Sequence, residues 1–368
     1  MKTAFHLSSF TIAALALAAS TAAMAQSNTS SVTVYGVVDA NVQVLDGAST
    51  LTRVQSGGLN GSRLGFKGSE DLGGGLRAIF TLESGLNIDD GSTGQGTFWG
   101  RQAFVGLATP VGTVTLGRQY GSLYTLSSDF SEFSNNNVGA STAIIGGFGG
   151  YEPVRGVSAT STASATGNGG PARVNNSIKY ESVRFGGFSG GALVGLGEAA
   201  GNTSGNRLGD VYVRYSDYGF DAMLSYVDDK AELTNANVRT TSAAASYTFG
   251  PARVTGGVIS VDDRSVANAD GEGYWVGGSY RFGGTHLVKA QYVESKLKNT
   301  PIDGKTKAFG VGYQYDLSKR TALYTSVTQF KNEGTGYTPR AAGSFPGGVV
   351  TAGDPDITEF AAGIRHSF

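Results

Sequence analysis

The sequence predicts an all-β fold: a sixteen-stranded antiparallel β-barrel that spans a membrane, with a long third external loop folded into its lumen. Three observations predict it. Apolar and polar residues alternate with a period of two along most of the chain. Short turns and longer polar loops strictly alternate between the predicted strands. No segment beyond the leader approaches the roughly 18–20 apolar residues of a spanning helix, and in lipid only a closed sheet then satisfies every backbone group.

The first 25 residues resemble a secretory leader and stand apart from the barrel. Lys2 supplies a positive charge, residues 12–17 form a short apolar run, and Ala23 and Ala25 are the small residues of a cleavage site. We therefore expect a signal peptide at 1–25, cleavage before Gln26 and a single β-barrel domain at 26–368, exported through the periplasm.

Composition narrows the class of protein. The chain has 57 glycines and 8 prolines, together with 17 tyrosines and 19 phenylalanines. Disordered chains are poor in aromatic residues, so many tight turns between strands explain the glycine better than disorder does. The absence of cysteine excludes disulfides and thiolate sites. A formal net charge of −1 gives no reason to expect a nucleic-acid partner.

The connections between strands give the strand count. Seven short turns are predicted at 70–75, 109–112, 185–188, 217–219, 249–251, 282–284 and 316–319. Eight longer loops lie near 46–60, 87–98, 120–171, 200–205, 231–236, 264–271, 297–303 and 333–356. Their strict alternation requires sixteen strands, with both termini on the side of the short turns. Strands of about 10 residues at a tilt of about 45° cross the hydrocarbon layer.

Aromatic residues gather beside the short turns. They are Phe185, Phe188, Tyr215, Tyr218, Tyr247, Phe249, Tyr280, Phe282, Tyr313 and Tyr315. Hairpin ends often carry aromatics, but repetition at one end of nearly every hairpin favours an aromatic girdle at the inner membrane interface.

The segment 121–171 passes without sustained alternation, and a connection of this length is expected to be functional or disordered. Its first part carries Tyr124, Asp129, Phe130, Glu132 and Phe133, and its end is rich in Ser, Thr, Ala and Gly. A sixteen-stranded barrel is too wide for its own side chains to fill. We expect the first part to narrow the lumen and the end to form an external loop.

Four motifs and the first strand together resemble the general porins of Gram-negative outer membranes, in particular the β-proteobacterial branch. They are SRLGFKGSEDLGGGLRAIFTLESG (62–85), RQAFVGL (101–107), GTVTLGRQYG (112–121), GIRHSF (363–368) and VTVYGVVDA (32–40). The resemblance spans both ends of the mature chain. It implies a homotrimer of sixteen-stranded channels for small hydrophilic solutes, in contact with the lipid bilayer and lipopolysaccharide, with no cofactor or metal.

The resemblance also implies a constriction. Arg63, Arg101 and Arg173 match the places that supply the cationic wall in such porins, and Asp129 and Glu132 resemble the acidic side opposite. Some branches have proline before the glutamate where this chain has Ser131, which leaves the register of Asp129 less well defined.

Parity along the strands is an independent guide to direction. We expect the following residues to face outward: Leu64, Phe66, Gln102, Phe104, Val174 and Ile178. Because alternate residues of a strand point to opposite faces, Arg63, Lys67, Arg101 and Arg173 are then expected to face the lumen. Arg77 and Glu83 are expected to point inward, away from the narrowest level. Arg118 shares the outward parity of Val114 and Leu116, and we expect it to contact Asp89 or Asp90 of a neighbouring protomer. The alternative to a constriction is that these inward arginines are simply solvated, as charged residues would be in any water-filled lumen.

The carboxyl-terminal Phe368 alternates with His366 and Ile364. In view of the resemblance we interpret this end as a signal for the outer-membrane assembly machinery; the alternative is a last strand that merely faces lipid.

The predicted function is a passive outer-membrane channel for ions and small hydrophilic solutes. Charges at a constriction lie within a Debye length, about 8 Å, of permeating ions, and three cations against two carboxylates predict mild anion preference. A substrate-specific channel and a barrel adhesin are the alternatives. An enzyme is disfavoured, because the mature chain has only His286 and His366, neither placed to serve a nucleophile.

Overall fold

A computed structural model describes residues 30–134, 138–142, 172–197, 207–230, 237–264, 270–298, 305–333 and 356–368. The predicted signal peptide at 1–25 and the low-complexity end of the third loop lie outside these residues. Within the described part of the chain, no helix is long and apolar enough to cross a membrane.

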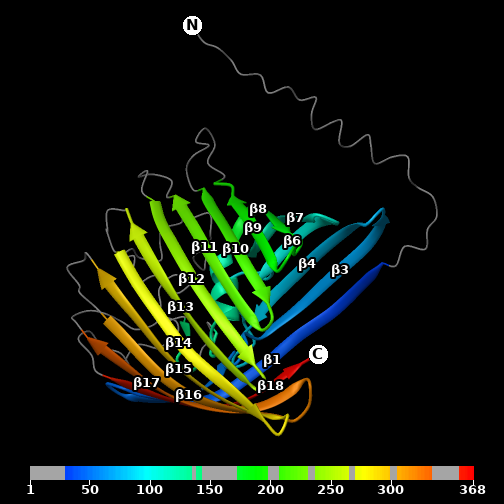
Figure 1. Ribbon diagram of the computed structural model, residues 1–368. Coiled ribbons are helices and arrows are strands. Elements are labelled where there is room, and N and C mark those ends of the chain that lie inside the picture. Colours follow the sequence, from blue (N-terminus) through cyan, green and yellow to red (C-terminus); the bar gives the residue numbers. More distant parts are fainter. Residues whose placement is uncertain are drawn as a thin grey trace.

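One continuous antiparallel sheet closes on itself, because the first strand pairs with the last (Figure 1). The strands are β1 (Ser31–Asp46), β2 (Thr50–Ser56), β3 (Arg63–Gly73), β4 (Leu76–Leu86), β5 (Thr93–Gly94), β6 (Gln102–Thr109), β7 (Gly112–Tyr120), β8 (Arg173–Ser182), β9 (Phe188–Gly195), β10 (Leu208–Asp217), β11 (Phe220–Lys230), β12 (Asn237–Phe249), β13 (Ala252–Asp263), β14 (Asp270–Phe282), β15 (His286–Lys298), β16 (Lys305–Asp316), β17 (Thr321–Glu333) and β18 (Ile357–Ser367).

The barrel wall has sixteen strands, as predicted. Of the eighteen strands in the sheet, β2 and β5 belong to loops: β2 extends the loop after β1, and the two-residue β5 pairs with the end of β4. β1 therefore pairs with β3 along its first half and with β2 along its second. All seven predicted short turns join adjacent strands of the wall.

The outer face of the wall is apolar because side chains alternate along each strand. Its outward side chains are about half exposed, as expected of a surface that faces lipid. They include Val211, Leu224, Val258, Val276 and Val311. Beside the short turns the predicted aromatic girdle is also outward, and all of its members except the half-buried Tyr215 are exposed, Phe185 and Tyr218 most of all.

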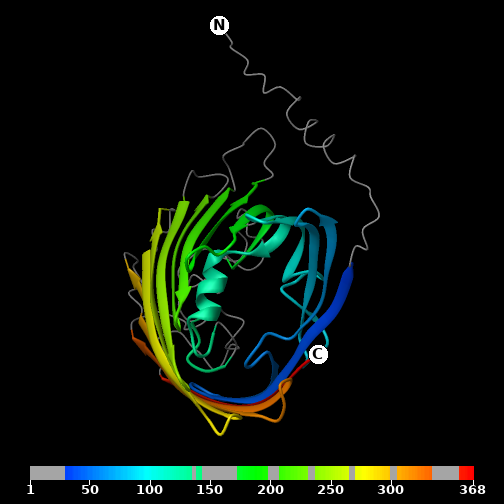
Figure 2. The same cartoon turned by 45° about the vertical axis from the view of Figure 1, so that its right-hand side comes forward.

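The third loop enters the barrel, as predicted, but it begins with a helix that the sequence did not predict. Helix α2 (Ser122–Asp129) lies inside the barrel and contacts β10, β11 and β12 (Figure 2). Its Leu123 and Leu126 are fully buried. The described remainder of the loop, 130–134 and 138–142, continues along the inner wall.

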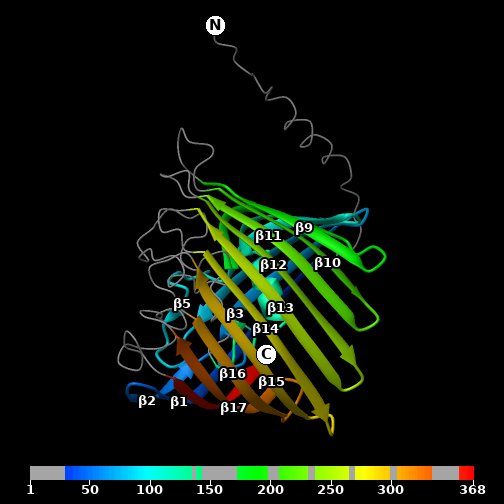
Figure 3. The ribbon, with the colours of Figure 1, turned by 60° about the vertical axis from the view of Figure 1, so that its left-hand side comes forward.

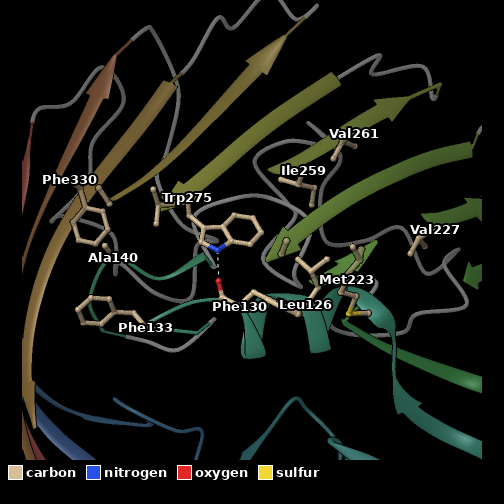
Figure 4. Packing of buried hydrophobic residues seen from close by; sticks show 14 of the residues in the cluster. Leu126, Phe130, Phe133, Ala140, Met223, Val227, Ile259, Val261, Trp275 and Phe330 are labelled. Carbon is tan, nitrogen blue, oxygen red and sulfur yellow. Dashed lines mark hydrogen bonds between the residues drawn. The ribbon is translucent and has the colours of Figure 1, made fainter. Parts of the chain in front are cut away.

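A hydrophobic cluster holds the loop to the inner wall. Leu126, Phe130 and Phe133 of the loop pack in a cluster with wall residues including Met223 and Trp275 (Figure 4). The Trp275 indole Nε1 donates a hydrogen bond of 2.6 Å to the Phe130 carbonyl. Several inward side chains of the wall here are apolar, because they meet the loop and not water. The core of this protein is thus the seam between loop and wall.

Three of the outward parity assignments are wrong, two in β6 and one in β8. In β6, Gln102 lies opposite Glu83, and residues paired across strands share a face, so Gln102 and Phe104 face inward. The outward residues of β6 are Val105 and Leu107, both about half exposed. Arg101 precedes the strand, which begins at Gln102, so strand parity does not fix its direction.

In β8, Val174 is fully buried in the cluster against the loop and does not face lipid. The register shifts between Gly117 and Gln119 of β7, where their partners Ser177 and Val174 are three residues apart. Asn176, within this bulge, has a φ of 47°. The extra residue turns Val174 inward, while Ile178 stays outward and exposed. Parity therefore does not turn Arg173, the first residue of β8, toward the lumen; its contacts with the Tyr120 and Tyr124 rings place it beside α2.

Candidate functional site: an arginine cluster and the anchored third loop

Two arginines pair with a single carboxylate on one side of the lumen, and tyrosine rings join a third arginine to them. Arg101 Nε lies 2.9 Å from Oε1 of Glu83, and Arg63 Nη1 lies 3.9 Å from its Oε2. The Arg101 and Glu83 side chains are almost fully buried, whereas Arg63 is partly exposed. We call Arg63, Arg101, Arg173 and Glu83, with the tyrosines that contact them, the arginine cluster.

Glu83 occupies a different position from the one expected. It was predicted to face the lumen away from the narrowest level, and it does face inward, but it lies within the arginine cluster. Tyr35 and Tyr120 donate hydrogen bonds of 2.9 and 3.0 Å to its two carboxylate oxygens. The register explains this position, because Glu83 pairs with Gly65, two residues from Arg63. Gly65 leaves room there for the Tyr35 ring.

Arg173 contacts the cluster through the faces of two tyrosine rings. The Tyr120 and Tyr124 rings stack with centroids 3.8 Å apart, and the Arg173 guanidinium carbon lies 5.1 and 5.4 Å from those centroids. No ion pair to Arg173 is formed by the residues that the structure describes. Cation–π contacts of this kind leave the charge of the guanidinium uncompensated.

The positive potential of the cluster acts on Tyr124 of α2. Burial of the Tyr124 phenol works to raise its pKa, but Arg101, Arg63 and Arg173 outweigh it and lower the pKa below the usual value. A nearby positive charge stabilises the anionic form of an acid. The same field would stabilise an anion passing beside the cluster.

The acidic residues of the loop have partners of their own on the inner wall. Asp129 lies 2.7 Å from Arg214, which also binds Asp221 at 2.5 Å. Glu132 lies 3.0 Å from Arg253. Sequence reasoning expected Asp129 and Glu132 to form the acidic side opposite the cationic wall. In the structure Glu132 is paired with Arg253, and Asp129 shares Arg214 with Asp221.

Polar side chains of the wall fix the loop backbone as well. Gln291 accepts a hydrogen bond from the Glu132 amide at 2.7 Å and donates one to the Ala140 carbonyl at 2.6 Å. Lys289 Nζ donates to the Glu132 carbonyl at 2.9 Å. Farther along, the Gly139 amide donates to Glu359 at 2.7 Å. The loop is thus held at several points from β13 to β18.

The remaining inward candidates lie apart from the cluster centre. Lys67 is exposed, with its Nζ 5.4 Å from the Tyr35 ring centroid. Arg77 shares the inward face of Glu83 but is the second residue of β4, beside the short turn and exposed.

Arg118 faces outward, as its parity predicted, since it pairs with Ala103. It is bound within its own protomer, donating to the Gly100 carbonyl at 2.8 Å and to the Asn175 side chain. Asp89 and Asp90 are exposed in the second loop, where Asp90 accepts two hydrogen bonds from Ser92. A role of these three residues between protomers stays a prediction.

The carboxyl terminus completes the closure of the barrel. The backbones of Phe368 and Gly36 exchange two hydrogen bonds of 3.1 Å, and the Phe368 ring covers Gly36, where a β-carbon would collide with it. His366 is exposed on the same outward face and contacts the Thr321 hydroxyl.

Several residues of the site escaped the sequence reasoning. Tyr35, Tyr120, Arg214, Arg253 and Gln291 were not singled out. Alternation along the strand could have shown that Arg253 and Thr255 face inward. Only the path of the third loop shows that these wall residues contact the loop. No cluster of potential metal ligands occurs among the described residues.

Comparisons with known proteins agree with this architecture. A family model described as Gram-negative porin matches residues 11–335. Outer membrane porin protein 32 of Delftia acidovorans is 33% identical, covering 97% of this chain and 99% of its own. The structure of an anion-selective porin from Comamonas acidovorans superposes with a TM-score of 0.76 at 30% identity, over 92% of this chain and 100% of that one. The trimer form of OmpT from Vibrio cholerae shares the fold, with a TM-score of 0.66 at 17% identity over 92% and 99%.

Proposed function

This chain belongs to the Gram-negative porin family, and we propose that its arginine cluster gives the channel a mild preference for anions. The protein is a passive channel of the outer membrane for small solutes. No chemistry is required of such a channel, and we propose that the chain has no enzymatic activity.

One observation carries the preference for anions. The cluster contains three arginines, Arg63, Arg101 and Arg173, and one carboxylate, that of Glu83, which pairs with Arg101 and Arg63, so it holds an excess of two positive charges. The loop offsets only part of this excess, because Arg253 compensates Glu132, while Arg214 is shared by Asp129 and Asp221 and leaves one negative charge there. A permeating ion passes within about one Debye length of these groups, so their balance, and not the net charge of the chain, sets the selectivity. The relative from Comamonas is described as anion-selective, which favours the same sign.

Reversal potentials in a salt gradient test this function. Purified protein in a planar bilayer should show a reversal potential of the sign for anion flow, with permeability to both ion classes. Arg63→Ala and Arg173→Ala should each reduce the preference, whereas Lys319→Ala, in the exposed turn after β16, should not. Cation preference in the wild type would contradict the proposal.

We propose in addition that three protomers assemble with Arg118, Asp89 and Asp90 near their contacts. Phe368 and His366 would present the outward carboxyl-terminal pattern to the assembly machinery, and lipopolysaccharide would surround the outer end. Crosslinking of the purified protein tests the trimer: a three-chain product in wild type that decreases in Arg118→Ala supports this arrangement, and a product limited to single chains contradicts it.

A further inference from the structure

Part of the first loop turns back into the barrel. The loop begins with β2, which lies beside β1 at the end of the barrel away from the short turns (Figure 3). Asp39 of β1 faces inward, because its neighbour Val38 is exposed on the outer wall. The chain reverses against this inner face, where the Asp39 carbonyl accepts hydrogen bonds from the Gly57 amide at 2.8 Å and the Ser62 hydroxyl at 2.9 Å. We call residues 57–62 the first-loop return.

The Asp39 carboxylate binds the backbone of the first-loop return with both oxygens. Oδ1 accepts a hydrogen bond from the Gly58 amide at 3.0 Å, and Oδ2 accepts from the Leu59 and Asn60 amides, each at 2.8 Å. The Tyr324 hydroxyl of β17 donates to Oδ1 at 2.6 Å. Asp39 is fully buried, and these four donors, all from the described part of the chain, replace the water that a buried carboxylate has lost. The carboxylate therefore anchors the loop and lies out of reach of a permeating ion.

The last residues of the return contact two arginines of the arginine cluster. The Gly61 carbonyl accepts a hydrogen bond from Arg63 Nε at 2.9 Å. A β-carbon on Gly61 would lie 2.9 Å from Arg101 Nη1, so a larger residue there would have to displace that guanidinium. The position of the backbone at Gly61 therefore affects where both guanidinium groups lie.

The middle of the return contacts the third loop and the wall behind it. Leu59 packs in a small apolar cluster that contains Val138 of the third loop and Tyr324 and Ala361 of the wall. The Asn60 side chain accepts a hydrogen bond from Arg365 Nη1 of β18 at 3.0 Å. The first-loop return thus connects the arginine cluster with the far part of the third loop.

We propose that the first-loop return is a second element of the constriction, beside the third loop, and that Asp39 is its positioning residue. The interaction energy of two charges falls as their distance grows, so an ion in a wider opening interacts less strongly with the arginines. Release of the return from Asp39 would widen the opening and free Arg63 and Arg101 from the Gly61 backbone. The proposal deepens the proposed function and rests on the preference for anions stated there.

Single-channel conductance and the reversal potential of Asp39→Asn test the proposal. Asparagine keeps the size of the side chain but has one acceptor oxygen in place of two, so loop amides lose their partner. The variant should conduct more than the wild type, and its ratio of anion to cation permeability should fall by about twofold. An effect of charge alone would have the opposite sign, because removal of a carboxylate from the inner wall favours anions.

Two further variants leave every charge in place. Tyr324→Phe removes one of the four donors to Asp39 and should change both quantities in the same direction but less. Gly58→Ala places a β-carbon where it collides with the Tyr324 hydroxyl and should displace the return. Asp46→Asn removes an equal charge from the exposed end of β1 and is the matched control, which should behave as wild type does.

Higher anion preference at unchanged conductance in Asp39→Asn would overturn the proposal, and so would wild-type conductance and selectivity in Gly58→Ala. Lower anion preference in Gly58→Ala, a variant without any change of charge, would support it even where Asp39→Asn fails to fold. Cation preference in the wild type would instead contradict the proposed function, and the rise in conductance would still report on the first-loop return.

Discussion

Arg101 and Glu83 form an ion pair that water hardly reaches. Arg101 Nε lies 2.9 Å from Glu83 Oε1, and the two side chains are 5% and 3% exposed. Removal of one partner of a buried ion pair leaves the other charge without compensation, at a cost of about 3–5 kcal/mol. The pair therefore belongs to the structure of the constriction as much as to its selectivity.

We expect Arg101→Ala to lower the free energy of unfolding by about 3 kcal/mol or more, because the Glu83 carboxylate stays buried without its guanidinium partner. Chemical denaturation in detergent, followed by tryptophan fluorescence, measures the change. Arg77→Ala, an exposed arginine on the same face of β4, is the matched control and should change stability little. Equal stability of the two variants would contradict a buried pair.

Glu83→Gln should make the channel more selective for anions. The substitution keeps the size of the side chain and removes the one carboxylate of the cluster, which pairs with Arg63 and Arg101. The reversal potential in a salt gradient should move farther in the anion direction than in wild type. A shift toward cations would show that Glu83 is not a counter-charge of the cluster.

Arg253→Ala should reduce the preference for anions, although Arg253 lies outside the arginine cluster. The substitution leaves the Glu132 carboxylate without the guanidinium that lies 3.0 Å from it, so a negative charge of the loop acts on the lumen. Arg184→Ala removes an equal charge from an exposed pair with Asp217 beside the short turn and serves as the control. Equal selectivity of both variants would mean that Arg253 does not compensate the loop.

Gln291→Leu should loosen the third loop. The variant leaves the Glu132 amide and the Ala140 carbonyl without their buried partner, at about 1–3 kcal/mol for each group. We expect lower thermal stability and larger fluctuations of the open-channel current. Gln329→Leu, on the outward face of β17, should leave both unchanged. A quiet, wild-type current in Gln291→Leu would refute the anchoring role.

The wall of this protein was predictable from sequence, and its interior was only partly so. Alternation and turn spacing gave the sixteen strands, because a lipid-facing sheet enforces a period of two on every strand. The same rule failed at Val174, where a bulge reverses the side-chain direction, and at Gln102 and Phe104, which face inward.

The pairing of charges inside the barrel was harder to predict from the sequence. Arg63 and Arg101 were found through their motifs, but Glu83 joins them only through the β3–β4 register. The partners of Asp129 and Glu132 lie 85 and 121 residues away along the chain. No local pattern encodes such contacts, since they depend on where the loop descends along the wall.

The reversal potential of the wild-type channel in a salt gradient, compared with Arg63→Ala/Arg173→Ala, tests the central claim most directly. We predict anion preference in the wild type and a clear loss of it in the double variant, with the Arg101–Glu83 pair intact. Cation preference in the wild type, or unchanged anion preference in the double variant, would contradict the assignment of selectivity to the arginine cluster.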